Sequence, residues 1–203
     1  MDNAEKLTLI LMKNLLPISL TGLCAIVALG LCGCGTFSGA KRDRAIAELN
    51  PTQGNKAHGT VTFTKVKGGV RVVADVYDLT PGEHGFHLHE KGDCSAPDAS
   101  SAGGHFNPAG MPHGGPKSVR RHAGDFGNLV ADFSGHAHKR FVEPLLTFQG
   151  PSSIIGRAVV VHENPDDLIT QPTGNSGARV ACGVIQKVVE SAPAAAETKP
   201  ETK

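Results

Sequence analysis

The chain has few large aromatic residues and no excess of charge of either sign. It contains no tryptophan and one tyrosine among 203 residues, against 25 glycines and 13 prolines. A composition so rich in turn-forming residues favours many short strands over a helical bundle. The formal net charge of +1 gives no electrostatic reason to expect nucleic acid as a partner. The length suits one folded domain with appendages.

The sequence has one long apolar run, which spans 15–35 and begins shortly after Lys13. It has about the length of the apolar region of a secretory signal peptide and ends in small residues. Its final "LCGC" resembles the lipobox of bacterial lipoproteins, in which processing leaves a diacylated cysteine as the first mature residue. We therefore expect a lipoprotein signal peptide over 1–33 and a lipid on Cys34. An uncleaved anchor of roughly 20 apolar residues is the alternative.

The segments outside the folded part predict where the protein resides. Residues 1–11 carry acidic side chains where a signal peptide needs basic ones, so translation can start at Met12. We expect a lipidated tether over 34–56, a folded domain over 57–189 and a disordered tail over 190–203, which is rich in Ala, Pro, Glu and Lys. This organisation predicts a periplasmic protein anchored to a membrane by its lipid. Gly35 stands where aspartate is associated with inner-membrane retention, which favours the outer membrane.

The five cysteines are odd in number, and the expected leader and lipid together account for three of them. Cys24 and Cys32 would leave with the signal peptide, and Cys34 would carry the lipid. Cys94 and Cys182 remain, and in an exported, oxidising compartment we expect them to form a disulfide. Such a bond would close a loop of nearly ninety residues and contribute about 4–5 kcal/mol on a chain-entropy estimate. Two free thiols are the alternative.

The folded part shows strand patterns and no well-supported helix. Residues 58–66 and 69–79 alternate β-branched and polar side chains around a Lys-Gly-Gly turn, which predicts a hairpin. Further strands are expected within 85–90, 127–144, 154–163 and 179–189. Two long stretches without periodicity, 93–121 and 164–178, are expected to be functional loops. Together these features predict an all-β antiparallel sandwich or barrel with two long loops.

Histidine is concentrated in a few segments of the folded part. In "HLH", His87 and His89 are two residues apart, so on a strand both side chains point to one face and can bind one ion. The loop that follows adds three histidines and an aspartate, and another histidine ends the apolar strand. These residues are His105, His113, His122, Asp125 and His162.

The clustered histidines indicate metal binding. Imidazoles in a dry, strand-lined position must be paired or metal-bound, because an unsatisfied buried polar group costs free energy. Neutral imidazole suits copper, zinc, iron and nickel, and a carboxylate added to three imidazoles suits tetrahedral zinc. The residues alone predict two nitrogen-rich sites, one with a carboxylate, and leave the reaction open. His58 is expected at the surface, and His136 and His138 in an exposed hairpin turn without function.

Six segments resemble, in order and spacing, the defining segments of copper/zinc superoxide dismutases. They are "GFHLHEKGDC", "GGHFNP", "HGGP", "RHAGDFGN", "GRAVVVHE" and "TGNSGARVACGVI", and they extend over nearly all of 58–186. The resemblance implies a Greek-key β-sandwich or flattened barrel of about eight antiparallel strands. It also implies disproportionation of superoxide to dioxygen and hydrogen peroxide by alternate reduction and oxidation of copper, as antioxidant defence in the cell envelope.

The resemblance further implies a role for each site residue. Copper would be held by His87, His89, His105 and His162, and a structural zinc by His105, His113, His122 and Asp125. His105 would bridge the two ions and act in catalysis by releasing and taking up a proton. Arg179 would be catalytic as the cation that attracts and orients the superoxide anion.

Two more residues acquire supporting roles from the resemblance. Asp166 would hydrogen-bond one histidine of each metal site, with its neighbour Asp167 as the alternative. His84 would brace the copper-binding strand without being a ligand.

One departure from the family pattern concerns electrostatic steering. The loop from Asp166 to Arg179 is shorter than in many eukaryotic members, and Pro172 stands where a guiding lysine is expected. We therefore expect weaker steering that depends mostly on Arg179. The competing class is a non-catalytic metal-binding domain such as a periplasmic copper buffer. A homodimer is compatible with the sequence, which does not identify an interface.

Overall fold

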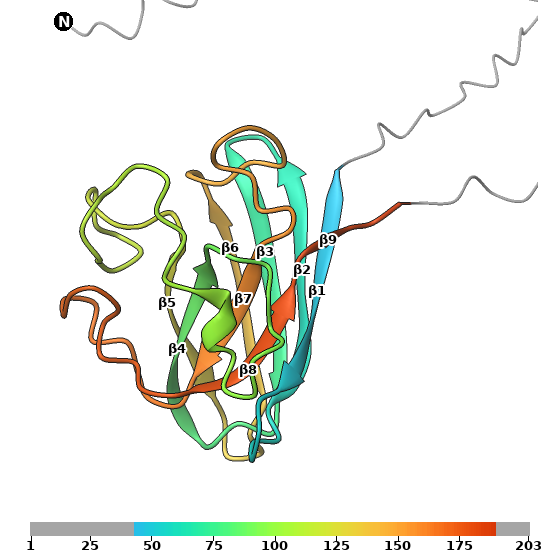
Figure 1. The fold of residues 1–203 in the computed structure, drawn as a ribbon, viewed down its shortest axis with the longest axis vertical. Helices are drawn as coiled ribbons and strands as arrows, with labels where there is room; N and C mark the ends of the chain where they lie inside the picture. The colour runs from blue at the N-terminus through green and yellow to red at the C-terminus, as the bar shows by residue number, and fades with distance from the viewer. Residues whose placement is uncertain (1–42, 190–203) are drawn as a thin grey trace, which may run out of the picture. The chain divides into compact units, whose positions relative to one another are not determined.

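The computed structural model describes residues 43–189, which form nine strands and one short 3-10 helix (Figure 1). The strands are β1 (Arg44–Pro51), β2 (His58–Val66), β3 (Gly69–Tyr77), β4 (Gly82–His89), β5 (Asp125–Ala131), β6 (Ala137–Glu143), β7 (Ala158–His162), β8 (Arg179–Val184) and β9 (Gln186–Lys187), and the helix is η1 (Ser100–Ala102). The expected signal peptide, the lipid site at Cys34 and the tail 190–203 lie outside the described residues. Between residues 43 and 189, no helix is long and apolar enough to cross a membrane.

The strands curl into a nearly closed antiparallel barrel. Their order is β5-β4-β7-β8-β1-β2-β3-β6, and the two-residue β9 pairs with β1. After β3 the chain crosses to β4 and β5 at the other end of this order and returns as β6 beside β3, which is a Greek-key connection. The predicted all-β fold with about eight antiparallel strands is confirmed, and so is the hairpin of β2 and β3.

The barrel interior is filled by alternate residues of each strand. In β3, Val70, Val72, Ala74 and Val76 are buried while their neighbours are partly exposed, because successive side chains of a strand point to opposite faces. Strand β7 differs, since all five of its residues are buried. Its second face is covered by a small cluster outside the main core, formed by Ala99, Ala102, Ala158, Val160, Cys94 and Cys182.

Strand β1 corrects the expectation that 34–56 is a tether. Residues 44–51 form a central strand that pairs with β2, β8 and β9. Ala45, Ala47 and Leu49 alternate with exposed or half-buried residues and lie in the core. Two of these three inward positions are alanines, so the apolar signal in the sequence is weak although its period is that of a strand. The folded part therefore begins by Arg44, not at residue 57.

The connection between β5 and β6 also differs from the predicted hairpin. A turn at 132–136 joins the two strands, and Asp132 Oδ1 accepts the backbone N–H groups of Ser134 and His136. The strands then take positions at opposite ends of the sheet order, with no backbone ladder between them. Lys139 links them instead, because its Nζ donates to the carbonyls of Phe126 and Asn128 at 2.7 Å each.

The two long loops lie side by side at one flank of the barrel (Figure 1). One joins β4 to β5 over 90–124 and the other joins β7 to β8 over 163–178. Because β4 and β7 are adjacent and antiparallel in the sheet, histidines on both strands can reach the space beneath these loops.

Candidate metal centre

Four histidines from two strands and a loop converge on one point. They are His87 and His89 on β4, His105 in the β4–β5 loop and His162 at the end of β7. One ring nitrogen of each lies within 4.8 Å of the others, and all four side chains are buried. The pairing register shifts next to His87 and next to His162, and such irregularities re-aim a side chain. The structure thus brings together the four residues expected at a copper site.

Each of these histidines has one hydrogen-bonded nitrogen and one free nitrogen. His89 and His162 donate from Nδ1 to backbone carbonyls of the two loops, at 2.9 and 3.2 Å. In His87 and His105 the bonded nitrogens, Nε2 and Nδ1, face carboxylates. The other four atoms, His87 Nδ1 and Nε2 of His89, His105 and His162, are buried and have no partner. Because buried polar atoms without partners cost free energy, four of them facing one another fit a cation that accepts nitrogen ligands.

Burial also keeps these rings neutral. It lowers the pKa of His162 to about 3 and that of His105 to about 4. Burial lowers the pKa of His87 and His89 as well, although Asp166 acts in the opposite direction on His87. A neutral imidazole has the free lone pair that metal binding requires, so the local electrostatics favour a ligand over a protonated histidine.

A second group shares His105 and adds a carboxylate. Asp125 Oδ1 lies 2.9 Å from His105 Nδ1, 3.0 Å from His113 Nδ1 and 3.1 Å from His122 Nδ1. These four ligand atoms form the other cluster whose members lie within 4.8 Å of one another. His105 therefore presents Nε2 to the first group and Nδ1 to the second. Three nitrogens and one carboxylate oxygen form a donor set that suits tetrahedral zinc.

The second group attracts positive charge. Burial alone would raise the pKa of Asp125, but hydrogen bonds from His105, His113 and His122 hold it far below its usual range. Burial likewise works to lower the pKa of His113, yet its bonds to Asp125 and Asp166 raise it to about 9. A carboxylate among three imidazoles thus stabilises a proton or, in its place, a metal cation.

Asp166 connects the two groups. Its Oδ2 accepts a hydrogen bond from His87 Nε2 at 2.8 Å, and its Oδ1 accepts one from His113 Nε2 at 2.9 Å. The alternative residue, Asp167, instead accepts the backbone N–H groups of Ile169 and Thr170 within its own loop. Of the two neighbours, Asp166 is therefore the one that orients the rings.

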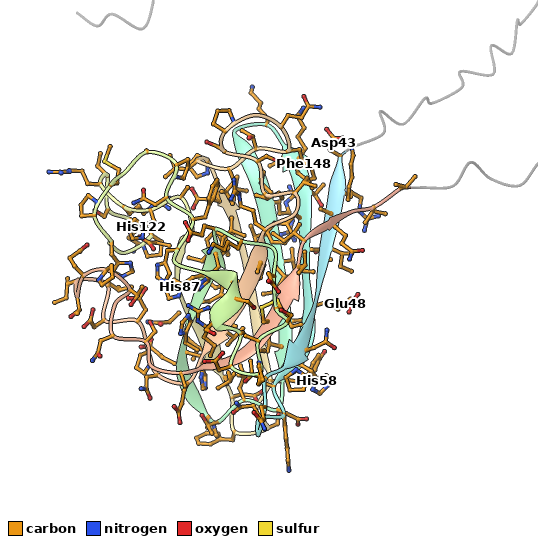
Figure 2. The ribbon with its side chains drawn as sticks, viewed as in Figure 1. Asp43, Glu48, His58, His87, His122 and Phe148 are labelled. Carbon is orange, nitrogen blue, oxygen red and sulfur yellow. A yellow bond between two sulfur atoms is a disulfide. The ribbon has the colours of Figure 1, made fainter. Side chains whose placement is uncertain are left out.

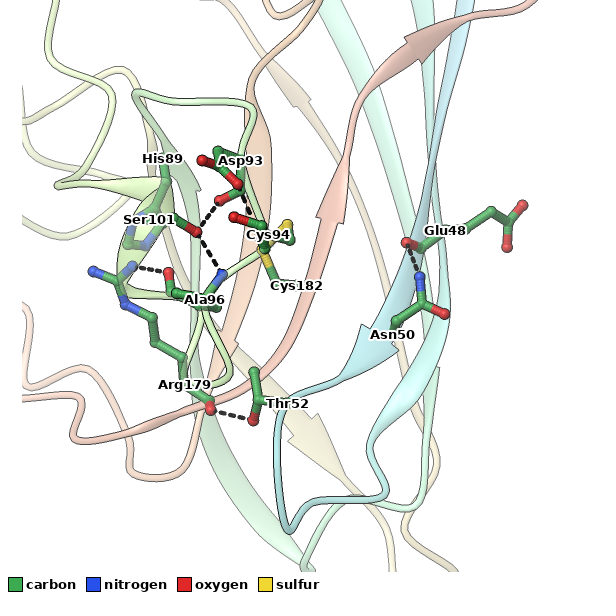
Figure 3. The surroundings of a disulfide bond; sticks show 12 residues. Glu48, Asn50, Thr52, His89, Asp93, Cys94, Ala96, Ser101, Arg179 and Cys182 are labelled. Atoms are coloured by element: carbon green, nitrogen blue, oxygen red, sulfur yellow. Dashed lines mark hydrogen bonds between the residues drawn. A yellow bond between two sulfur atoms is a disulfide. The ribbon is translucent and has the colours of Figure 1, made fainter.

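Arg179 begins β8 and lies against the loop that carries the disulfide (Figure 3). Its guanidinium donates to the backbone carbonyls of Ala99 and Gly103, the second at 2.7 Å. These bonds fix the plane of the guanidinium. Since both acceptors are carbonyls rather than carboxylates, its positive charge remains available to an anion.

His84 and His58 are placed as the sequence suggested, whereas His138 lies on β6 instead of in a hairpin turn, and His136 in the preceding turn is half-buried. His84 donates from Nδ1 to the carbonyl of His162 at 2.8 Å, so it braces the end of β7 and is no ligand. His58 is exposed, and His136 and His138 surround Asp75 outside the barrel. None of these last three belongs to a cluster of metal ligands within residues 43–189.

Gln171 is a supporting residue that the sequence did not reveal. Its Oε1 accepts the backbone N–H of His113 at 2.8 Å, and its Nε2 donates to the carbonyl of the same residue at 2.9 Å. His113 is thus held by its backbone through Gln171 and by its ring through Asp166, both on the β7–β8 loop. No sequence signal marks a polar side chain in a loop as such a partner.

A buried ion pair fixes the C-terminal end of the β4–β5 loop. Arg121 Nη2 contacts both carboxylate oxygens of Glu143, at 2.7 and 2.8 Å, and Nη1 donates to the carbonyl of His122. Arg121 directly precedes His122, and Glu143 is the last residue of β6. The pair therefore attaches the loop to the end of β6 at the position next to His122. No pattern in the sequence marks Arg121 or Glu143 for this contact.

The predicted disulfide is present between Cys94 and Cys182 (Figure 3). It joins the β4–β5 loop to β8 with a Cα–Cα distance of 5.9 Å. The alternative of two free thiols is excluded, and the bond lies in the small apolar cluster that also contains Ala99.

Comparisons with known proteins agree with this geometry. The sequence profile of the family described as "Copper/zinc superoxide dismutase (SODC)" matches residues 57–185. Among solved structures, one described as "Crystal Structure Analysis of the clock protein EA4" is similar, with 46% sequence identity and a TM-score of 0.66. The match covers 71% of this chain and 94% of that chain. On its sequence, its barrel and its paired histidine clusters, this chain belongs to the copper/zinc superoxide dismutase family.

Proposed function

We propose that the chain disproportionates superoxide to dioxygen and hydrogen peroxide at the two histidine groups. The observation that carries this proposal is the position of His105, which contributes one nitrogen to a group of four converging unpartnered atoms and directs the other nitrogen at Asp125. Membership of the superoxide dismutase family supports the same reaction.

The donor atoms assign a metal to each group. Copper, held by His87, His89, His105 and His162, would supply reversible one-electron chemistry, while zinc at His105, His113, His122 and Asp125 would supply a fixed positive charge. By bonding to Nε2 of His87 and of His113, Asp166 keeps one ring of each group in the orientation that points Nδ1 toward the other ligands of that group.

Two residues of the chain handle the substrate and the proton. Arg179 attracts the superoxide anion and orients it, because its guanidinium is permanently charged and held flat by two backbone carbonyls. His105 can hold a proton on Nε2 while Nδ1 stays at Asp125, so it can deliver that proton to the reduced product.

Metal loading tests the proposal directly. The full chain loaded with copper and zinc is expected to remove superoxide catalytically, and a copper chelator should abolish this activity until copper is added again. Chain loaded with zinc alone is expected to be inactive, because zinc does not change its oxidation state. A chain that binds both metals tightly and does not catalyse would instead be a copper-binding protein without this reaction.

Replacing Arg179 by alanine is expected to lower kcat/KM by about tenfold, the lower end of what electrostatic steering contributes. The dependence of kcat/KM on ionic strength should flatten at the same time, since Pro172 replaces the lysine expected in the neighbouring loop. Arg140→Ala, which removes an exposed arginine on β6, is the matched control and should leave both quantities unchanged. An unchanged rate and slope in Arg179→Ala would contradict the assigned role.

Replacing Gln171 by methionine is expected to speed zinc release about tenfold, since losing a partner that orients a ligand typically costs 10–100-fold in metal affinity. Methionine keeps the length of the side chain but cannot bond to the backbone of His113. The rate of zinc transfer to a chromogenic chelator measures the effect. Gln149→Met in an exposed loop is the control, and equal rates for both variants would refute the role of Gln171.

We further propose that the enzyme acts in the cell envelope as a lipoprotein anchored through Cys34. The "LCGC" segment and the apolar run before it support this proposal. Mass spectrometry of the N-terminus of membrane-extracted protein tests it. A diacylated Cys34 as first residue is expected, and an intact leader or an unmodified cysteine would refute it.

A further inference from the structure

Five cations gather at the end of the barrel where β1 begins. They belong to β1, the β2–β3 hairpin and β9, and are Arg44, Lys65, Lys67, Arg71 and Lys187. The strand register brings them together, because Thr64 pairs with both Arg44 and Arg71, and Lys187 pairs with Ala45 beside Arg44. Four of the five are exposed and Arg71 is half-buried. We call this group the cationic end.

Few anions offset these charges. Asp43, which is partly exposed, lies 3.7 Å from Lys65 and 3.3 Å from Lys187. Glu143 is nearby but is buried against Arg121. The adjoining loop 144–157 contains no acidic residue. Counted over residues 43–189, five cations against one partly exposed carboxylate give this end a net charge of +4.

Carboxylates collect at the opposite end of the barrel. Asp78 follows β3, Glu83 lies near the start of β4 and Asp132 follows β5, and all three are exposed. Figure 2 shows the distance between the two ends, with Asp43 at one and His58, the neighbour of Asp78, at the other. Cations at one end and carboxylates at the other give the molecule an electric dipole, while its net charge is only +1. A charged surface would therefore orient the molecule strongly but attract it only weakly.

Strand β1 separates the cationic end from the proposed substrate arginine. Thr52, directly after β1, donates from Oγ1 to the carbonyl of Arg179 at 2.7 Å, whereas Arg44 is the first residue of the strand. The eight residues of β1 span about 26 Å at ~3.3 Å per residue. This is about three Debye lengths at physiological ionic strength, so an anionic surface at the cationic end would repel little of the superoxide that reaches Arg179.

We propose that the cationic end docks on the anionic phospholipid headgroups of the membrane that holds the lipid, with Arg179 turned away from the bilayer. The proposal rests on the proposed lipid at Cys34. Nine residues lead from Cys34 to Asp43, so the lipid keeps this end within about 30 Å of the bilayer surface. Lys41 and Arg42 add two cations to this short segment. Exposed Val142 and Leu145 next to the cationic end add apolar surface for the interface.

Vesicle binding of the mature chain without its lipid tests the docking surface. The chain begins at residue 34 with Cys34→Ser, is loaded with copper and zinc, and is sedimented with vesicles of phosphatidylglycerol and phosphatidylethanolamine in equal parts. Lys65→Gln/Lys67→Gln is expected to bind these vesicles about 25-fold more weakly, about fivefold for each lysine. Lys56→Gln/Lys91→Gln changes the net charge equally at exposed positions elsewhere and should change binding less than twofold. Vesicles of phosphatidylcholine alone should bind no variant.

The outcomes separate docking from lipid attachment. Equal losses in both double variants, or no binding to anionic vesicles at low salt, would overturn the docking surface even if mass spectrometry finds the lipid on Cys34. Specific loss in the first variant with no lipid on Cys34 would retain the docking surface and refute the anchor. A fluorescent label on Gln149→Cys lies in the loop beside the cationic end, and one on Ser134→Cys lies in the turn at the opposite end. Nickel bound to lipid headgroups should quench the fluorescence of the first label more than that of the second. The reverse order would refute the orientation.

Discussion

Replacing His162 by alanine is expected to reduce superoxide removal by more than about 100-fold. The variant loses one of the four buried nitrogens that face one another without partners. Because losing even a hydrogen-bond partner of a metal ligand costs 10–100-fold in affinity, losing the ligand itself should cost more. The group around Asp125 does not include His162, so the variant should still bind one equivalent of zinc.

The control for this result is His138→Ala. His138 also belongs to a His-x-His segment, but it is exposed and pairs with Asp75 outside the barrel. Metal content by mass spectrometry and the superoxide assay are measured on both variants. If His162→Ala kept its copper and its rate, or if His138→Ala lost either, the assignment of the first histidine group would be wrong.

Removing the disulfide with Cys94→Ser/Cys182→Ser is expected to lower the free energy of unfolding by about 4–5 kcal/mol. The bond spans 88 residues, so it restricts the unfolded chain strongly. Its loss should also disturb catalysis, because the loop it anchors carries the carbonyl of Ala99 that holds Arg179. Urea unfolding of metal-free protein isolates the effect on stability from the effect of metal binding.

Wild-type protein in reducing buffer provides the matched comparison for the double variant. Both should unfold at the same, lower urea concentration, since both lack the same bond. A loss below about 1 kcal/mol in each would show that the unfolded chain is already restricted by other contacts.

The residues that converge on the two histidine groups could be predicted because their segments follow the family in order and spacing. The disulfide was expected because the predicted signal peptide and lipid leave only Cys94 and Cys182 in the folded part. Strand β1 was not predicted because two of its inward residues, Ala45 and Ala47, are small. The apolar alternation in this segment is therefore too weak to distinguish a strand from a flexible tether. Its place in the barrel depends on pairing with β2 and β8, which no local pattern encodes.

Supporting contacts were less predictable than the clustered histidines. Arg120 and Arg121 are adjacent and chemically identical, yet the first is exposed and the second is buried against Glu143. Only the packing of the loop on β6 distinguishes them. Gln171 is similar, since a glutamine beside a proline in a polar loop gives no sign of bonding to a backbone 58 residues away.

Lys139 lies where β5 and β6, the two end strands of the sheet, face each other without a backbone ladder, and it determines which backbone carbonyls of β5 stay unpaired there. Strands with unpaired backbone groups are templates on which another chain can add a strand and begin to aggregate. Here the ammonium of Lys139 occupies two carbonyls of β5, and its charge lies 5.5 Å from the centre of the Phe141 ring. One side chain therefore covers two carbonyls at the open edge of the barrel, and neutralising it would leave those carbonyls free to accept hydrogen bonds from another strand.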